Sequence, residues 1–288
     1  MSTGPSLETL LGLEPGGCCA SAYDSPAVRW LLGDELHPGG DELSRRLAGL
    51  SGIEPGGRVL DVASGRGRTA RLLASEIGAE VTGIELSPQS VAAAQVEADA
   101  AGLAGRVRFL AGDAAVLPAP SGAFDAVVCE CALCLFADKD DALAEMRRVL
   151  RPGGVVAISD VTGEAGQLPA ALLGPAGQVA CLADALPLDG YQALLDRAGF
   201  EPLAAESHDG ALATLAERVE DRLRAARILV GATEYATAIA EAIELVRVAR
   251  RAIAAGELGY GLFIARRPAL ANVRPPRLRS AAGTVEGA

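Results

Sequence analysis

Short apolar runs alternate with amphipathic segments through most of the chain, and this alternation predicts its architecture. The apolar runs predict buried strands, and the segments between them have the apolar spacing of helices. Strands are expected at residues 58–63, 80–86, 107–113, 124–131, 155–161, 201–207 and 259–268. Strands that alternate with helices in this way predict βαβ units. We therefore expect an α/β fold of the Rossmann-like, doubly wound type, with a mostly parallel seven-stranded sheet and helices on both faces.

The segments outside this alternation predict additional parts of the molecule. In chain order, the expected parts are a flexible N-terminus at 1–17, a helical lid at 18–55, the α/β core at 56–208, a helical hairpin at 209–257, the last strand at 258–268 and a disordered tail at 269–288. The hairpin is expected to bend near Gly231 and to have one apolar face. That face either caps the site or forms a homodimer interface.

The composition limits the partners and the compartment. The formal net charge is −11, which argues against a nucleic-acid partner, because nucleic-acid binding needs a clustered basic face. No apolar run reaches the roughly 18–20 residues of a membrane span, and the first residues do not resemble a signal peptide. We therefore expect a cytoplasmic protein that binds no membrane, with its six cysteines reduced.

Three features at expected strand ends predict a nucleotide-like cofactor. A turn with Ser64, Gly65 and Gly67 follows Asp61, and its glycines allow close approach of a ligand. Glu85 ends the second strand 24 residues after Asp61, where an acid can bind both ribose hydroxyls. Each feature has a simpler explanation, a tight turn or a solvated acid. Together with an acid at the end of the third strand, Asp113, which can accept a hydrogen bond from an adenine amino group, they favour a ligand.

These residues resemble the class I S-adenosylmethionine-dependent methyltransferases over residues 56–161. The resemblance rests on VLDVASGRGR, GIEL, GDAAVLP, FDAVVCECAL and RVLRPGG. It implies S-adenosylmethionine as the cofactor, held by Asp61, Ala63, Ser64, Gly65, Gly67, Glu85, Leu86, Asp113, Ala114 and Cys129. Ala63 stands where the family usually has a glycine, so we expect a slight backbone rearrangement there. A nicotinamide-dependent dehydrogenase also explains the turn, but it does not predict the downstream motifs.

The cysteines are the unusual feature of the sequence. Cys129 and Cys131 alternate at the end of the fourth strand and are expected to share a face, with Glu130 opposite. Cys134 follows, and for Cys129 and Cys134 we favour the role of small buried hydrophobic residues. Cys131 borders the expected cofactor site, so we do not extend that interpretation to it.

A narrower resemblance concerns the arsenite methyltransferases. The stretch VVCECALCLFADKDDALAEMRRVLRPGGVVAISDV and the segment ACLADALPLDGYQALLDRAGF are similar to theirs. The resemblance implies that Cys131 and Cys181 bind trivalent arsenic, with Cys18 or Cys19 as a third thiolate. Soft thiolates suit a soft, thiophilic acceptor. The segment YDSPAVRWLLGDELHPGG and the helices at 210–256 depart from that family, which leaves a sister group with another acceptor open.

Three alternatives therefore stay open. The acceptor is a small organic molecule methylated on O, N, C or S, in which case Tyr23, Trp30, Glu130 or His37 shapes or deprotonates it. The cysteines bind structural zinc, although a fourth ligand and the usual paired spacing are missing. The domain binds S-adenosylmethionine without catalysis, as a regulatory protein. The lid is also open: its apolar face at residues 27–32 covers the cavity mouth or simply packs on the domain.

Overall fold

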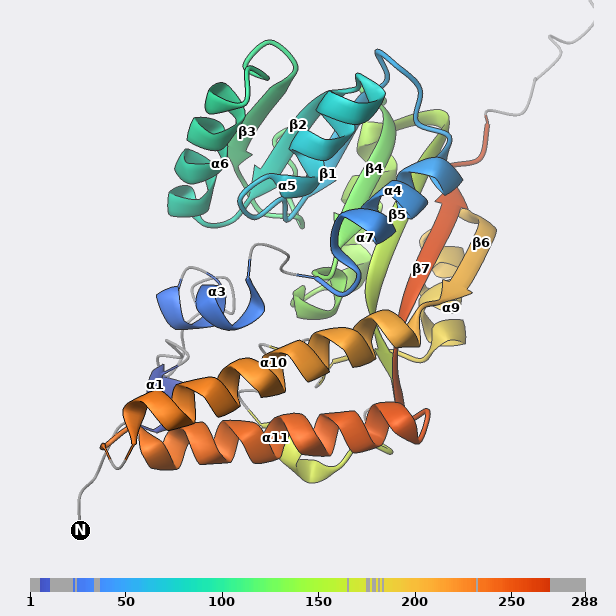
Figure 1. Ribbon diagram of the computed structural model, residues 1–288. Helices are drawn as coiled ribbons and strands as arrows, with labels where there is room; N and C mark the ends of the chain where they lie inside the picture. Colours follow the sequence, from blue (N-terminus) through green and yellow to red (C-terminus); the bar gives the residue numbers. More distant parts are fainter. Residues whose placement is uncertain are drawn as a thin grey trace, which may run out of the picture.

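The computed structural model describes residues 6–10, 23, 25–33, 37–164, 166–174, 177, 180, 182, 184–231 and 233–269. One seven-stranded sheet forms its centre, with the strand order β3-β2-β1-β4-β5-β7-β6 (Figure 1). The strands are β1 (Arg58–Val62), β2 (Glu80–Glu85), β3 (Val107–Ala111), β4 (Phe124–Glu130), β5 (Leu150–Gly163), β6 (Glu201–Ser207) and β7 (Leu258–Arg266). The first five pair in parallel, and β7 runs antiparallel between β5 and β6. The predicted fold class is confirmed.

Helices cover both faces of the sheet because the central strands are apolar on both sides. On one face lie α4 (Gly40–Ser51), α5 (Arg68–Leu72) and α6 (Pro88–Ala100), which bury Leu47, Ala70 and Ala94 against the sheet. On the other face, α7 (Lys139–Val149) and α9 (Leu188–Arg197) bury Met146 and Leu194. The chain thus forms a three-layer structure with one apolar core on each side of the sheet.

Local sequence signals explain where several of these helices begin. The Ser87 side chain accepts the N–H of Ser90 at the start of α6, and Pro88 occupies the first turn. The Asp138 side chain accepts the N–H of Asp141 at the start of α7. One difference from the prediction lies after α5, where residues Leu73–Ile77 form a π-helical turn instead of continuing the α-helix. This widened turn ends at Gly78, which has a positive φ of 81°.

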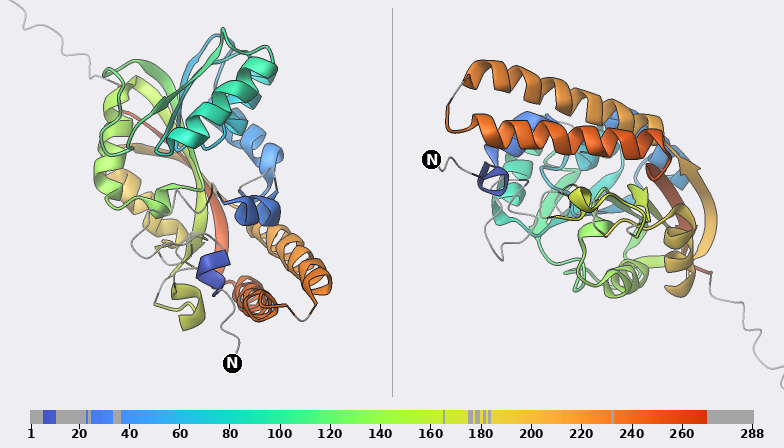
Figure 2. Two further views of the ribbon diagram at one scale, coloured as in Figure 1. Left: turned by 90° about the vertical axis from the view of Figure 1, so that its left-hand side faces the viewer. Right: turned by 90° about the horizontal axis from the view of Figure 1, so that it is seen from below.

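Two long helices lie across the end of the sheet where the parallel strands finish. These helices are α10 (Asp209–Val230) and α11 (Ala236–Ala254), which follow β6 and precede β7 along the chain. They run side by side as a helical hairpin (Figure 2). Two short N-terminal helices, α1 (Leu7–Leu10) and α3 (Pro26–Leu32), contact them. Part of the N-terminal segment that was expected to be flexible is thus helical. No helix among the described residues combines the length and apolar character needed to cross a membrane.

The apolar face of α3 lies against the helical hairpin, and its side chains do not line the cavity. Leu31 and Leu32 pack on a third apolar cluster, which contains Val219, Leu223 and Ile243. Trp30 stays 52% exposed. Of the two interpretations, the structure therefore favours packing of this apolar face on other helices over a cover for the cavity mouth.

The contact between Gly83 and Phe109 gives a test of the packing beneath the cofactor-side turn. A Cβ added at Gly83 would lie 2.3 Å from a ring carbon of Phe109. We expect Gly83→Ala to lower the free energy of unfolding by about 1–3 kcal/mol, the usual cost of overpacking, measured by urea denaturation. The loss should shrink in a Phe109→Ala background. Gly105→Ala is the matched control, because a Cβ added there has open space around it. An equal loss from Gly83→Ala in the wild-type and Phe109→Ala backgrounds would show that contact with Phe109 is not the cause.

Candidate active site

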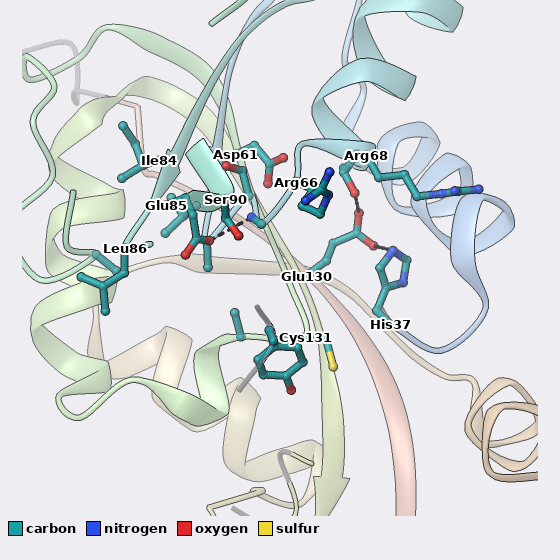
Figure 3. A pocket seen from close by; sticks show the side chains of 18 of the residues that line it. His37, Asp61, Arg66, Arg68, Ile84, Glu85, Leu86, Ser90, Glu130 and Cys131 are labelled. Carbon is teal, nitrogen blue, oxygen red and sulfur yellow. Dashed lines mark hydrogen bonds and ion pairs between the residues drawn. The ribbon is translucent and has the colours of Figure 1, made fainter. Parts of the chain in front are cut away.

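A cavity of about 610 Å³ opens at the carboxyl ends of β1, β2, β3 and β4. Open parallel sheets bind ligands at this edge, where the chain turns from each strand toward a helix. Figure 3 shows the side chains of Asp61, Glu85, Glu130 and Cys131 converging there from three strand ends. The described residues from the predicted site that line it are Asp61, Ala63, Ser64, Gly65, Glu85, Leu86, Asp113, Ala114, Glu130, Cys131, Tyr23 and His37.

Glu85 is held in one orientation by two backbone N–H groups. The N–H of Gly65 donates to one carboxylate oxygen and the N–H of Ser87 to the other, each at 2.9 Å. The residue is 9% exposed, at the end of β2. Each carboxylate oxygen has a second lone pair left, because an ionised carboxylate has about four acceptor positions. Glu85 can therefore accept two adjacent hydroxyl groups from a ligand.

Asp61 lies in the floor of the cavity with one oxygen unsatisfied. Asp61 Oδ2 and Ser64 Oγ are buried and have no hydrogen-bond partner within the described part of the chain. Burial raises the pKa of Asp61 well above its usual range, and the neighbouring Glu130 and Glu85 carboxylates raise it further. Buried polar atoms normally have partners, so these two atoms point to a missing polar ligand.

Glu130 is the centre of a hydrogen-bond network on the opposite wall. Its Oε1 accepts from Ser44 Oγ and Thr69 Oγ1, both at 3.0 Å, and its Oε2 lies 3.6 Å from His37 Nε2. His37 Nδ1 lies 3.2 Å from the Pro38 carbonyl oxygen, which can only accept. His37 Nε2 also lies 3.4 Å from Ser44 Oγ, so Ser44, His37 and Glu130 form one connected network (Figure 3). The partners Ser44 and Thr69 were missed by the sequence reasoning.

Backbone strain is concentrated at this cavity. Among the described residues, Ala63 with φ 58° and Cys131 with φ 52° are the non-glycine residues with positive φ. A left-handed conformation costs an ordinary residue about 1–2 kcal/mol, and such strain gathers at functional sites. Ala63 adopts a conformation that favours glycine, and the slight backbone rearrangement expected there stays a prediction. The N–H of Cys131 donates to the Ser159 carbonyl at 2.7 Å, which holds Cys131 in its conformation.

The expectation that Cys129 and Cys131 share a face is wrong. Strand β4 ends at Glu130, and the positive φ of Cys131 breaks the alternation of side chains. Cys129 is fully buried in the core beside α7 and α9, whereas Cys131 lines the cavity with Glu130. Cys129 therefore does not line the cofactor cavity. Burial, with the nearby carboxylates of Asp160 and Asp61, raises the pKa of its thiol.

One other residue of the predicted cofactor site differs in placement. Gly67 does not line the cavity; a Cβ added there would lie 2.1 Å from the Phe109 ring, so this glycine allows the turn to pack on β3. Cys134 is buried, as expected for a small hydrophobic residue. Cys18, Cys19 and Cys181 lie outside the described residues. Within the described ranges, no group of three or more His, Cys, Asp or Glu side chains could hold a metal ion.

The residues present fit S-adenosylmethionine. Glu85 offers two oxygens to a ribose, and the unsatisfied atoms of Asp61 and Ser64 await polar partners in the same cavity. Asp113 Oδ1 accepts the N–H of Ala115 at 2.9 Å, which leaves Oδ2 for a ligand amino group. Three carboxylates line the cavity, Asp61, Glu85 and Glu130, and S-adenosylmethionine has a positively charged sulfonium. Opposite charges at short range in a partly buried site attract strongly.

Asp160 supports the loop that carries Cys131. It is fully buried on β5, where one oxygen accepts the N–H of Cys134 and the other its neighbour Val161, both at 2.8 Å. Burial raises its pKa to about 6, although these N–H groups act in the opposite direction. The loop that it holds continues through the short helix η2 (Leu133–Leu135) to Phe136, another residue of the cavity wall.

Comparisons with known proteins agree with this site. A family described as "Methyltransferase domain" matches residues 60–158. The arsenite methyltransferase of Halobacterium salinarum is 30% identical over 216 residues, which are 72% of this chain and 55% of that protein. The 27-O-demethylrifamycin SV methyltransferase of Amycolatopsis mediterranei is 35% identical over 192 residues, 61% of this chain and 70% of that protein. The chain therefore spans between about half and about two thirds of these relatives.

A solved structure covers more of the chain. The crystal structure of the cyclase SpnF aligns with a TM-score of 0.73 and 26% identity, over 92% of this chain and 98% of that protein. The similarity thus extends beyond the sheet to most of the described helices. This similar structure is named for a reaction other than methyl transfer. The overall architecture therefore does not identify the acceptor, and the residues that line the cavity have to.

Asp160 gives a test of the site through the pH dependence of stability. A free aspartate has a pKa of about 3.9, so the raised folded-state value makes folding most favourable at low pH, where Asp160 is protonated in both states. As the pH rises through about 6, ionisation of Asp160 lowers the free energy of unfolding by about 3 kcal/mol. Asp160→Asn should remove this slope from the free energy of unfolding, measured by urea denaturation between pH 4 and pH 7. Exposed Asp196→Asn is the control, and parallel curves for wild type and Asp160→Asn would contradict the assignment.

Proposed function

The chain belongs to the S-adenosylmethionine-dependent methyltransferases, and we propose that it transfers a methyl group to a small acceptor held beside Cys131. The observation that carries the proposal is the convergence of Asp61, Glu85 and Glu130 with the strained Cys131 at one cavity. The cofactor supplies an electrophilic methyl group on a positively charged sulfur. The remaining work belongs to the residues of this chain, which bind, align and exclude water.

The cofactor half of the cavity has separate binding groups for separate parts of the ligand. Glu85 binds the ribose hydroxyls, because both of its oxygens are oriented by backbone N–H groups and keep free lone pairs. Asp113 accepts from the adenine amino group at the end of β3. Asp61 and Ser64 provide the unsatisfied polar atoms for the charged end of the ligand. A cation bound near Asp61 would stabilise its ionised form and offset the burial that raises its pKa.

For the acceptor, we propose trivalent arsenic bound by thiolates. Cys131 is the thiol that faces the cavity from the described residues, and Cys181 with Cys18 or Cys19 would complete a three-sulfur site. Soft thiolates bind a soft metalloid and leave its lone pair free for an in-line displacement. The similarity to an arsenite methyltransferase over 72% of the chain supports this choice.

The Glu130 and His37 pair favours a second candidate, a protic organic acceptor. When a neutral O–H, N–H or S–H group receives a methyl cation, it must release its proton. Glu130 lines the cavity, lies 3.6 Å from His37 and accepts hydrogen bonds from Ser44 and Thr69. It can accept that proton, while Ser44, Thr69 and His37 hold the carboxylate in place.

The cofactor assignment is tested by removing the ribose-binding carboxylate. We expect Glu85→Ala to weaken S-adenosylmethionine binding by about 1–3 kcal/mol, the usual contribution of hydrogen bonds to a charged group. Isothermal titration calorimetry measures the affinity, and circular dichroism checks that the variant is folded. Exposed Glu201→Ala, on the far edge strand β6, is the matched control. Unchanged affinity in Glu85→Ala would remove the basis of the cofactor assignment.

The acceptor proposal is tested at Cys131 with two variants. Cys131→Ser keeps the Cβ and removes the sulfur, so it should abolish release of S-adenosylhomocysteine with trivalent arsenic and leave cofactor affinity unchanged. Cys131→Gly should also abolish it, although relief of the positive φ should raise the free energy of unfolding by about 1 kcal/mol.

A parallel panel of phenols, quinols and amines separates the alternatives. Full arsenic turnover in Cys131→Ser would refute the thiolate role. Turnover of a protic acceptor that depends on Glu130 would favour the second candidate. Cofactor binding without any release of S-adenosylhomocysteine would identify a non-catalytic binding protein.

A further inference from the structure

The positively charged side chains around the cavity differ in whether a carboxylate neutralises them. Arg71 Nη2 lies 2.9 Å from Glu97, which also pairs with Arg66, and Arg68 Nε lies 2.6 Å from Asp41. His37, the histidine that lines the cavity, lies 3.6 Å from Glu130. Arg29, on α3, also lines the cavity. Within the described part of the chain it is the cavity-lining cation that no carboxylate neutralises.

Arg29 is held at the cavity by the packing of the short helix that carries it. Arg222 on α10 donates from Nη1 to the carbonyl oxygens of Trp30 and Leu31, at 3.1 and 2.8 Å. These carbonyls belong to the last turn of α3, whose backbone acceptors are otherwise unsatisfied. Leu31 and Leu32 pack on the hairpin cluster, while Arg29 lines the cavity. The hairpin therefore fixes the direction in which α3 presents its charge.

The cavity wall combines several carboxylates with Arg29, the arginine that no described carboxylate neutralises. Asp61, Glu85 and Glu130 make this wall acidic, and the whole chain has a formal net charge of −11. An anionic ligand would be repelled unless a cation met it at the entrance. A guanidinium that no carboxylate of the described residues neutralises is suited to this role, because it binds carboxylate or phosphate oxygens in a bidentate geometry.

We infer that the methyl acceptor carries an anionic oxygen group, a carboxylate or phosphate, which Arg29 binds at the cavity mouth. Arg29 is thus a specificity-determining residue that holds one end of the acceptor while the reacting atom lies near Cys131. This inference rests on the proposed methyl transfer. For a metalloid acceptor, it means that the arsenic arrives with anionic thiol ligands, which Arg29 binds before cysteines of the chain replace them. For an organic acceptor, it means that the molecule is an acid.

Complexes of trivalent arsenic with three small thiols test the inference, because they share a reacting centre and differ in charge. Thioglycolate gives an anionic complex, 2-mercaptoethanol a neutral one and cysteamine a cationic one. We expect kcat/KM, measured as release of S-adenosylhomocysteine, to be highest for the thioglycolate complex. Arg29→Ala should lower that value by roughly tenfold or more, leave the neutral complex unchanged and reduce the salt dependence. Arg29→Lys should recover part of the loss, and exposed Arg197→Ala on α9 should have no effect.

A binding measurement separates this inference from the proposed function. The chain has a single tryptophan, Trp30, which neighbours Arg29 and is 52% exposed, so its fluorescence reports ligands at the mouth. With the protein saturated in S-adenosylhomocysteine, a fluorescence change with thioglycolate that is lost in Arg29→Ala supports the anion site even if no arsenic complex is methylated. Equal binding and turnover of the anionic and neutral complexes, unchanged in Arg29→Ala, would overturn the inference and leave the methyl transfer intact.

Discussion

Three carboxylates at neighbouring strand ends, facing one partly buried cavity, are the constraint on which the rest of this site depends. Asp61, Glu85 and Glu130 come from β1, β2 and β4, so the parallel sheet itself brings like charges together. Each is accommodated differently: two N–H groups orient Glu85, hydroxyl groups and an imidazole surround Glu130, and Asp61 keeps one unsatisfied oxygen. Burial raises the pKa of Asp61 most, and the neighbouring carboxylates of Glu130 and Glu85 raise it further. A cationic ligand relieves this repulsion, which is the physical reason to expect a sulfonium cofactor here.

The elements added to the sheet give the cavity its second half. The hairpin of α10 and α11 supports α3 through a separate apolar cluster and through Arg222, and α3 in turn contributes Arg29 to the cavity. On the other side, buried Asp160 fixes the loop that begins at Cys131. We thus assign cofactor binding to the strand ends and acceptor choice to α3 and its supporting hairpin. The strained Cys131 lines the cavity that both parts share.

The sequence was sufficient for the sheet, because apolar runs report burial directly and the strands were found within a few residues. It was also sufficient for Asp61 and Glu85, whose positions follow from the strand ends. The sequence did not predict that Cys129 and Cys131 lie in different surroundings. Alternation of side chains applies only while a strand continues, and β4 ends at Glu130. Glu130 contacts His37 and Ser44, which are far from it in sequence, so no local sequence pattern predicts these contacts. Gly67 looked like a ligand-facing glycine, yet the ring of Phe109, on a different strand, is what requires it.

A crystal structure of the chain with bound S-adenosylhomocysteine tests most directly whether this cavity is the cofactor site. We expect the ligand in this cavity, with both ribose hydroxyls within hydrogen-bond distance of Glu85 and the sulfur on the side of Cys131. A ligand bound elsewhere, or one in the cavity whose ribose makes no contact with Glu85, would contradict it.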